Sequence, residues 1–134
     1  MSAWVLPAGL YILFLGVSGV TTKLALRTIS WEQLVLWVPI VYICICTVLL
    51  ATGTRFALGA GGAWAALTAV CVAAALVLFF IALTHGDAAT VVPVTSVYPV
   101  ITLIGAALFL SEKITLVRGL GTALVVAGVV LLSR

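Results

Sequence analysis

Long stretches without a charged side chain constrain this chain more than any other feature of its sequence. Five of them follow one another, over residues 1–22, 33–54, 56–86, 88–111 and 119–133. A helix rises about 1.5 Å per residue, so about 20 apolar residues cross the hydrocarbon core of a bilayer, which is about 30 Å thick. Lipid offers no hydrogen-bond partners to the backbone, which favours helices over open strands. The pattern therefore predicts an all-α integral membrane protein.

We expect five transmembrane helices joined by loops too short to hold a soluble domain. Their predicted positions are about residues 4–25, 32–52, 62–84, 88–110 and 115–133. The last helix reaches spanning length if Arg118 extends its charged group to the interface. Residues 1–134 then form a single transmembrane domain of a multi-pass protein, which we expect in the plasma (inner) membrane.

The composition excludes several classes of function. Hydrophobic residues make up 66% of the chain and charged residues 7%, against about 45–50% and 25% in soluble domains. A cytosolic enzyme, a nucleic-acid-binding module and a disordered chain are therefore excluded. One histidine and three carboxylates leave little for acid–base catalysis. No glycine-rich phosphate loop is present. We expect no enzyme activity, no cofactor and no bound metal, and the three cysteines are interpreted as packing residues.

The basic residues give no preferred orientation in the membrane. With five spans, each side of the membrane carries three Lys or Arg residues: Arg55, Lys113 and Arg118 on one side, and Lys23, Arg27 and Arg134 on the other. Orientation normally follows an excess of Lys and Arg on the cytoplasmic side. Three interpretations remain open. One predicted helix boundary is off by a residue, or the early charges after the first helix dominate, or the chain inserts both ways and pairs with an inverted copy of itself.

The C-terminal half carries motifs that resemble a known family. These are Ala82-Leu83 before a short polar loop, Pro93 and Tyr98-Pro99 in one helix, Glu112 with Thr115, and then Gly121 and Gly128. The pattern resembles the second half of an EamA domain, the repeat of the drug/metabolite transporter superfamily. The early segment KLALRTISWEQL is similar to the loop after the first helix of that domain. The family often has an arginine shortly after the start of its second helix, and this chain has Leu36 and Trp37 at that place.

The resemblance implies an assembly. Most EamA proteins carry two five-helix repeats of opposite topology in one chain, whereas this chain has one. It would therefore build the same ten-helix body as an antiparallel homodimer.

The last predicted helix has a second resemblance. Residues 121–129, GTALVVAGV, are similar to the dimerisation helix of the small multidrug resistance proteins. One stripe of this helix contains Gly121, Val125, Gly128 and Leu132, and small residues on a stripe let helix backbones approach closely. We expect these four residues at the dimer interface, with packing inside one chain as the alternative. The glutamate that those proteins use in helix one has no counterpart here, because residues 1–30 contain no Asp or Glu.

The predicted helix at 88–110 is the most informative about a transport pathway. Pro93 and Pro99 cannot donate the hydrogen bonds that a regular helix requires, and freed carbonyls at membrane depth must face protein or water. Predicted substrate-binding residues lie on this helix and on helices one to three: Tyr98, Thr95, Thr102, Tyr11, Ser18, Trp37 and Phe79. The alternative is structural, since Ser and Thr hydroxyls can bond to carbonyls of their own helix and aromatic rings can pack between helices.

The sequence therefore predicts a small drug/metabolite superfamily transporter that moves amphipathic or aromatic metabolites or drugs by alternating access, as an antiparallel dimer. Its expected partners are a small solute, the lipid bilayer and a second copy of the chain. Efflux down a gradient and transport driven by an ion gradient both remain open. Two other functions also remain open: an accessory subunit of a heterodimeric transporter, and a lipid-carrier flippase.

Overall fold

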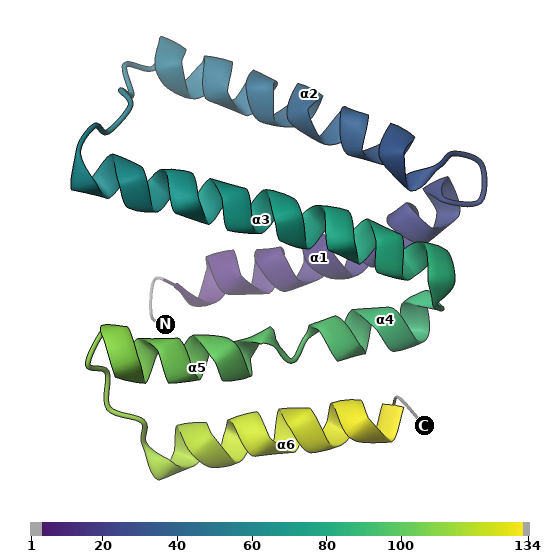
Figure 1. Ribbon diagram of the computed structural model, residues 1–134, viewed down its shortest axis with the longest axis vertical. Helices are drawn as coiled ribbons and strands as arrows, with labels where there is room; N and C mark the ends of the chain where they lie inside the picture. The colour runs from purple at the N-terminus through teal and green to yellow at the C-terminus, as the bar shows by residue number, and fades with distance from the viewer. Residues whose placement is uncertain (1–3, 133–134) are drawn as a thin grey trace. The chain divides into compact units, whose positions relative to one another are not determined.

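The computed structural model describes residues 4–132, which form six α-helices (Figure 1). In chain order they are α1 (Val5–Ala25), α2 (Trp31–Ala51), α3 (Ala60–His85), α4 (Ala88–Thr95), α5 (Tyr98–Phe109) and α6 (Leu116–Leu132). They divide into two compact units, Met1–His85 with α1–α3 and Gly86–Arg134 with α4–α6. The prediction of an all-helical protein is confirmed over the described residues.

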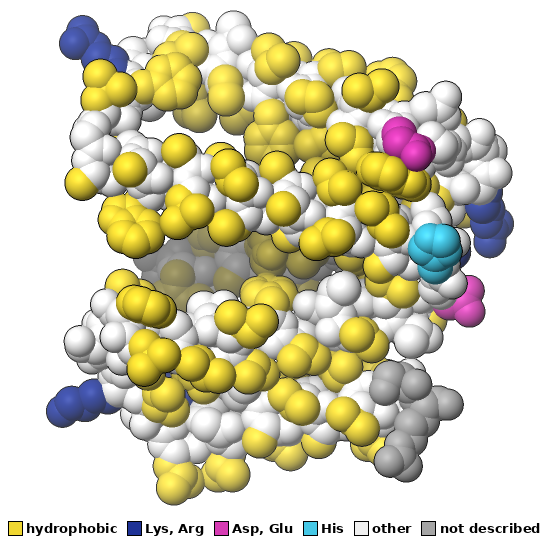
Figure 2. Space-filling view, viewed as in Figure 1, with side chains coloured by type: hydrophobic (Ala, Val, Ile, Leu, Met, Phe, Trp, Pro, Cys, Tyr) yellow, Lys and Arg dark blue, Asp and Glu magenta, His cyan; other side chains and the backbone are white. Residues whose placement is uncertain are grey.

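Four segments are long and apolar enough to cross a membrane. They are Val5–Ala25, Trp31–Ala51, Ala60–His85 and Ala88–Phe109, the last of which combines α4 and α5. The apolar helix α6 has 17 residues, at the lower end of the range for a spanning helix. Figure 2 shows apolar side chains over the outward faces of the helices in each unit, with charged side chains near helix ends. This distribution suits a protein whose helices face lipid.

The first unit is held together where the C-terminal ends of α1 and α3 meet. Gly19 and Thr22 of α1 are buried there, as are Phe80 and Leu83 of α3. Leu83 has no exposed surface at all. Helices α1 and α3 pack against each other, and a small residue such as Gly19 on a packed face suits close approach of two helices. Because both helices end at this contact, α1 and α3 run in the same direction.

A charged hydrogen bond connects the same two helix ends. The half-buried Lys23 Nζ donates to the Leu83 carbonyl oxygen at 2.8 Å. The last carbonyls of a helix lack partners within the helix and carry its partial negative charge. An ammonium group placed there donates a hydrogen bond to one of these carbonyls and interacts favourably with the negative end of the helix dipole. Lys23 therefore joins α1 to α3, a role that its position in the sequence did not indicate.

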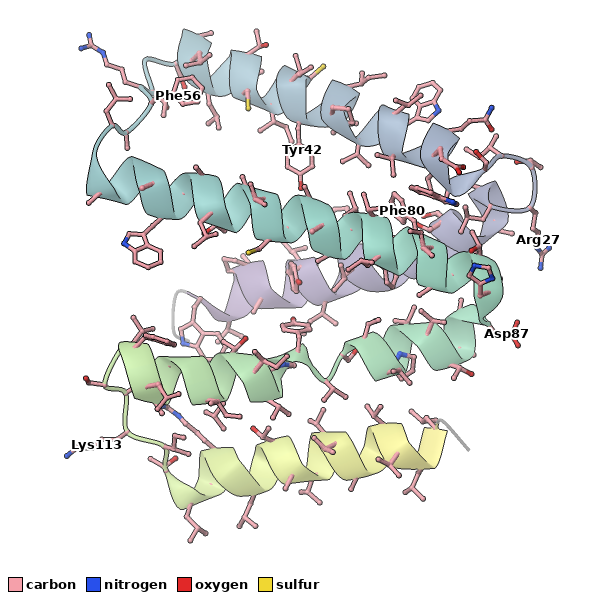
Figure 3. The ribbon with its side chains drawn as sticks, viewed as in Figure 1. Arg27, Tyr42, Phe56, Phe80, Asp87 and Lys113 are labelled. Carbon is pink, nitrogen blue, oxygen red and sulfur yellow. The ribbon has the colours of Figure 1, made fainter. Side chains whose placement is uncertain are left out.

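Helix α2 is bounded by clear local signals and contributes no buried residue. It begins with a capping box in which the Ser30 hydroxyl accepts from the Gln33 N–H and the Gln33 side chain accepts from the Ser30 N–H. It ends at Ala51, and two residues later Gly53 has a φ of +93°, the left-handed conformation that follows the end of many helices. Tyr42 extends from α2 toward α3 (Figure 3). The helix packs on α3 and otherwise presents apolar side chains outward.

The second unit differs from the expected pattern, because α4 and α5 replace the single helix predicted over 88–110. Pro99 has no N–H to donate to the Thr95 carbonyl, and its ring clashes with that carbonyl in a continuous helix. The chain therefore leaves the helix after Thr95 and begins α5 at Tyr98. Pro99 then lies in the first turn of α5, where a missing N–H costs nothing. The result is a helix broken near its middle.

Helix α6 returns alongside the two broken pieces (Figure 1). It begins after Thr115, whose hydroxyl accepts from the Arg118 N–H at 3.4 Å, and its closest packing is against α4. The break separates α5 from α4, so α5 is not part of the contact between α4 and α6. Space therefore remains between α5 and the N-terminal half of α6.

Candidate substrate groove

A groove of about 490 Å³ lies in this space, and it is defined by the broken helix. We call it the α5–α6 groove. Its walls come from the break, from α5, from the following loop and from α6: Val97, Tyr98, Pro99, Val100, Thr102, Leu103, Ala106, Glu112, Arg118, Gly121, Thr122 and Val125. All of these residues belong to the second unit, so its local fold is sufficient to form the groove.

The groove changes character along its length. Tyr98 is the eleventh residue of the 22-residue span Ala88–Phe109, which places it near the midplane if that segment crosses the bilayer. Leu103 and Ala106 continue the wall with apolar side chains, and Thr102 adds a hydroxyl. At the far end, beyond the last turn of α5, stand Glu112 and Arg118. An apolar and aromatic interior thus leads to an end that carries one group of each charge.

The turn after α5 fixes Glu112 in place. Ser111 has a φ of 54°, a left-handed conformation that residues with a Cβ seldom adopt. This turn lets the Glu112 N–H donate to the Ala106 carbonyl at 3.2 Å. The backbone of Glu112 is therefore bound to the last turns of α5. A carboxylate and the Arg118 guanidinium can between them bind the polar head of a dipolar solute.

The groove contains some predicted binding residues but not others. Tyr98 and Thr102 line it, and the Thr102 hydroxyl donates to the Tyr98 carbonyl at 3.3 Å. Thr95 lies outside it on α4, where its hydroxyl donates to the carbonyls of Val91 and Val92 at 3.0 and 2.9 Å. Hydroxyls bonded to their own helix agree with the structural alternative for both threonines. Their oxygens can still accept a hydrogen bond from a solute.

The other predicted binding residues belong to the first unit. Tyr11 and Ser18 lie on α1, and the Ser18 hydroxyl donates to the Leu15 carbonyl at 2.7 Å. Trp37 is exposed on α2, and the Phe79 ring lies 6.3 Å from that of Phe80 on α3. Their role in binding stays a prediction.

The predicted dimer stripe divides along α6. Gly121 and Val125 line the α5–α6 groove, in the same cavity as Tyr98 and Thr102. Gly128 and Leu132, further along the helix, do not line it. The first two residues therefore face space within one chain. Contact of any of the four residues with a partner helix stays a prediction.

Arg118 and Thr122 line the groove although the sequence predicts neither as a binding residue. Its pattern indicates only an interfacial anchor at Arg118 and no role for Thr122. Helical spacing offered the signal, because residues 118, 122 and 125 share one face with Gly121 at intervals of three and four. No pattern in the sequence indicated that this face would meet Tyr98, since that depends on where the chain breaks.

Comparison with known proteins decides the family. The EamA-like transporter family matches residues 2–134, nearly the whole chain. The chain belongs to the EamA-like transporter family. An uncharacterised transporter in the cobO 3′ region of Sinorhizobium sp is 29% identical to it over 136 residues, covering 98% of this chain and 96% of that protein. No solved structure matches the sequence.

A second relative of this EamA-like chain is an uncharacterised protein of Methanocaldococcus jannaschii. It is 40% identical over 70 residues, and the match spans about half of each protein, 52% of this chain and 51% of the relative. Family membership, together with the four apolar spans, makes this chain an integral, multi-pass membrane protein of a transporter family and not a member of an enzyme family. The resemblance to the EamA repeat is thereby confirmed.

Proposed function

We propose that this EamA-like protein carries small amphipathic or aromatic solutes across the plasma membrane, with the α5–α6 groove as the solute-binding site. The observation that carries the proposal is the placement of Tyr98 in a groove beside a broken helix. Transporter sites are typically formed near the bilayer midplane by interrupted helices, where irregular backbone can face a water-filled cavity. Family membership supports the transport activity.

The chemistry of the groove supports the proposed solute class. An aromatic ring and aliphatic walls suit a flat or apolar body, while Thr102, Thr122, Glu112 and Arg118 offer hydrogen-bonding and charged groups for a polar part. The volume of about 490 Å³ lies within the range of small-molecule sites.

A screen for bound solutes tests the proposal. Purified protein is challenged with a broad solute set at two pH values, and solutes that raise the melting temperature are tested for transport in proteoliposomes. We expect Thr102→Trp to fill the groove and to weaken binding of such solutes about tenfold or more. Thr68→Trp on α3 is the matched control, because its exposed hydroxyl also bonds to its own helix, at the Trp64 carbonyl. Normal transport by Thr102→Trp would place the solute site elsewhere.

We also propose that the working unit is an antiparallel dimer that operates by alternating access. The groove carries hydroxyl groups along its walls and Glu112 and Arg118 at one end, and within a membrane such groups favour a covering of water or of a second protein surface over lipid. A partner of inverted orientation would restore the paired repeats that transporters use to expose one site to either side. Gly128 and Leu132, which lie outside the groove, are the α6 residues that we assign to contact with the partner.

Dual insertion provides the test of this assembly. Because each side would carry three Lys or Arg residues, we expect C-terminal reporters to show partial activity for both cytoplasmic and external placement. Two lysines added beside Arg55 should drive a single orientation, and coexpression with an oppositely biased version should restore transport. A fully active unmodified protein with only one orientation would contradict the antiparallel dimer.

A further inference from the structure

Gly121 of α6 lines the α5–α6 groove. It lies within α6, where glycine is less favourable than alanine by about 1 kcal/mol, and its φ is not in the left-handed region. The backbone therefore does not require glycine here.

Packing within the chain does not require it either. A Cβ added at Gly121 would meet no heavy atom within 4 Å apart from its own helix backbone and chain neighbours. Since Gly121 lines the α5–α6 groove, a side chain there has empty groove space to enter. Glycine at this position therefore keeps the groove wider, and no packing contact within the chain depends on it.

We propose that Gly121 determines specificity by setting the width of the groove opposite α5, so that it limits the size of the solute that reaches Thr102 and Tyr98. This inference rests on the proposed function, in which solutes occupy the groove. It gives Gly121 a different role from Gly128, although both were predicted on one stripe for dimer contact. A Cβ at Gly128 likewise meets nothing within 4 Å, but Gly128 does not line the groove.

Labelling of a reporter cysteine measures the width without a known solute. Cys44, Cys46 and Cys71 are first replaced by alanine, which leaves Thr102→Cys as the one thiol in the chain. The protein in proteoliposomes then reacts with two methanethiosulfonates of the same charge, a small aminoethyl reagent and a bulky triethylammonium-propyl reagent. Each thiolate forms a mixed disulfide and releases methanesulfinate, so the rates can be compared directly. Gly121→Ala, Gly121→Leu and, as the control, Gly119→Leu are made in this background. Gly119 also lies on α6 with open space at its Cβ position, but it does not line the groove.

We expect Gly121→Leu to slow the bulky reagent about tenfold or more, the size of effect that overpacking produces, while the small reagent changes about twofold or less. Gly121→Ala should give an intermediate value and guards against misfolding of the leucine variant. Gly119→Leu should leave the ratio of the two rates unchanged. The inference is overturned if the two leucine variants behave alike, or if Gly121→Leu slows both reagents equally. Failure of both reagents to label Thr102→Cys with Gly121 intact would overturn the proposed groove site itself and this inference with it.

Discussion

Replacing Tyr98 with alanine is expected to weaken solute binding about tenfold or more and to abolish most transport, whereas Tyr98→Phe should keep most of both. Tyr98 is half exposed, at 52%, and it is the aromatic residue among those that line the groove. Aromatic and cation–π contacts and the apolar area of a ring each contribute about 1 kcal/mol or more, and 1.4 kcal/mol is a factor of ten in affinity. Phenylalanine retains the ring and loses only the hydroxyl.

Tyr42 is the matched control for this experiment. It has a similar exposed fraction, 57%, but lies on α2 in the first unit and outside the groove. Binding is measured by titration with a solute from the screen, and transport in proteoliposomes at equal protein density. Tyr42→Ala should bind and transport normally. If Tyr98→Ala does the same, the tyrosine fills space and the site lies elsewhere, with Tyr11 and Ser18 of α1 as the next residues to test.

Replacing Lys23 with methionine is expected to lower the free energy of unfolding by about 1.5–3 kcal/mol, the usual contribution of a hydrogen bond to a charged group. Methionine keeps a long apolar side chain against α3 but cannot donate to the Leu83 carbonyl. That carbonyl lies beside the fully buried Leu83 side chain, at the contact that joins α1 to α3. Its loss should therefore loosen the first unit at this end.

Arg27→Met provides the control, because Arg27 points outward from the same end of α1 (Figure 3) and its loss removes the same charge. Both variants change the Lys and Arg count on that side equally, so any effect on orientation is matched. Unfolding in detergent, followed by circular dichroism, distinguishes them, and Lys23→Arg should recover part of the difference. Equal stability of the two methionine variants would mean that the Lys23 hydrogen bond contributes nothing to the fold.

Much of the fold was predictable because the signals for membrane-spanning helices, such as apolar length and helix boundaries, lie in consecutive residues. Ser30 and Gly53 bound α2 through side-chain capping and a left-handed turn, and both depend only on near neighbours. The break at Ser96 and Val97 was only half predictable. Pro99 indicated freed carbonyls, but whether a proline kinks a helix or divides it depends on the backbone around it.

The site was predictable in part for a related reason. Tyr98 and Thr102 stood out because they follow a disrupted turn, and both line the groove. Arg118 and Gly121 were noticed for other roles, as an anchor and as a dimer contact. Both line the groove together with residues of α5, and that placement is set by packing between helices, which no local pattern records.

The sequence by itself determined that this protein spans a membrane and belongs to the EamA-like family, because apolar length and short motifs are properties of consecutive residues. Only the tertiary structure decided that Lys23 caps α3, that Gly121 faces the groove, and that Glu112 and Arg118 stand at one end of the cavity. The physical reason is that each of these contacts joins residues from different helices or from a loop and a helix. Their meeting depends on where the helices break and how closely they pack, and not on the residues on either side of them in the chain.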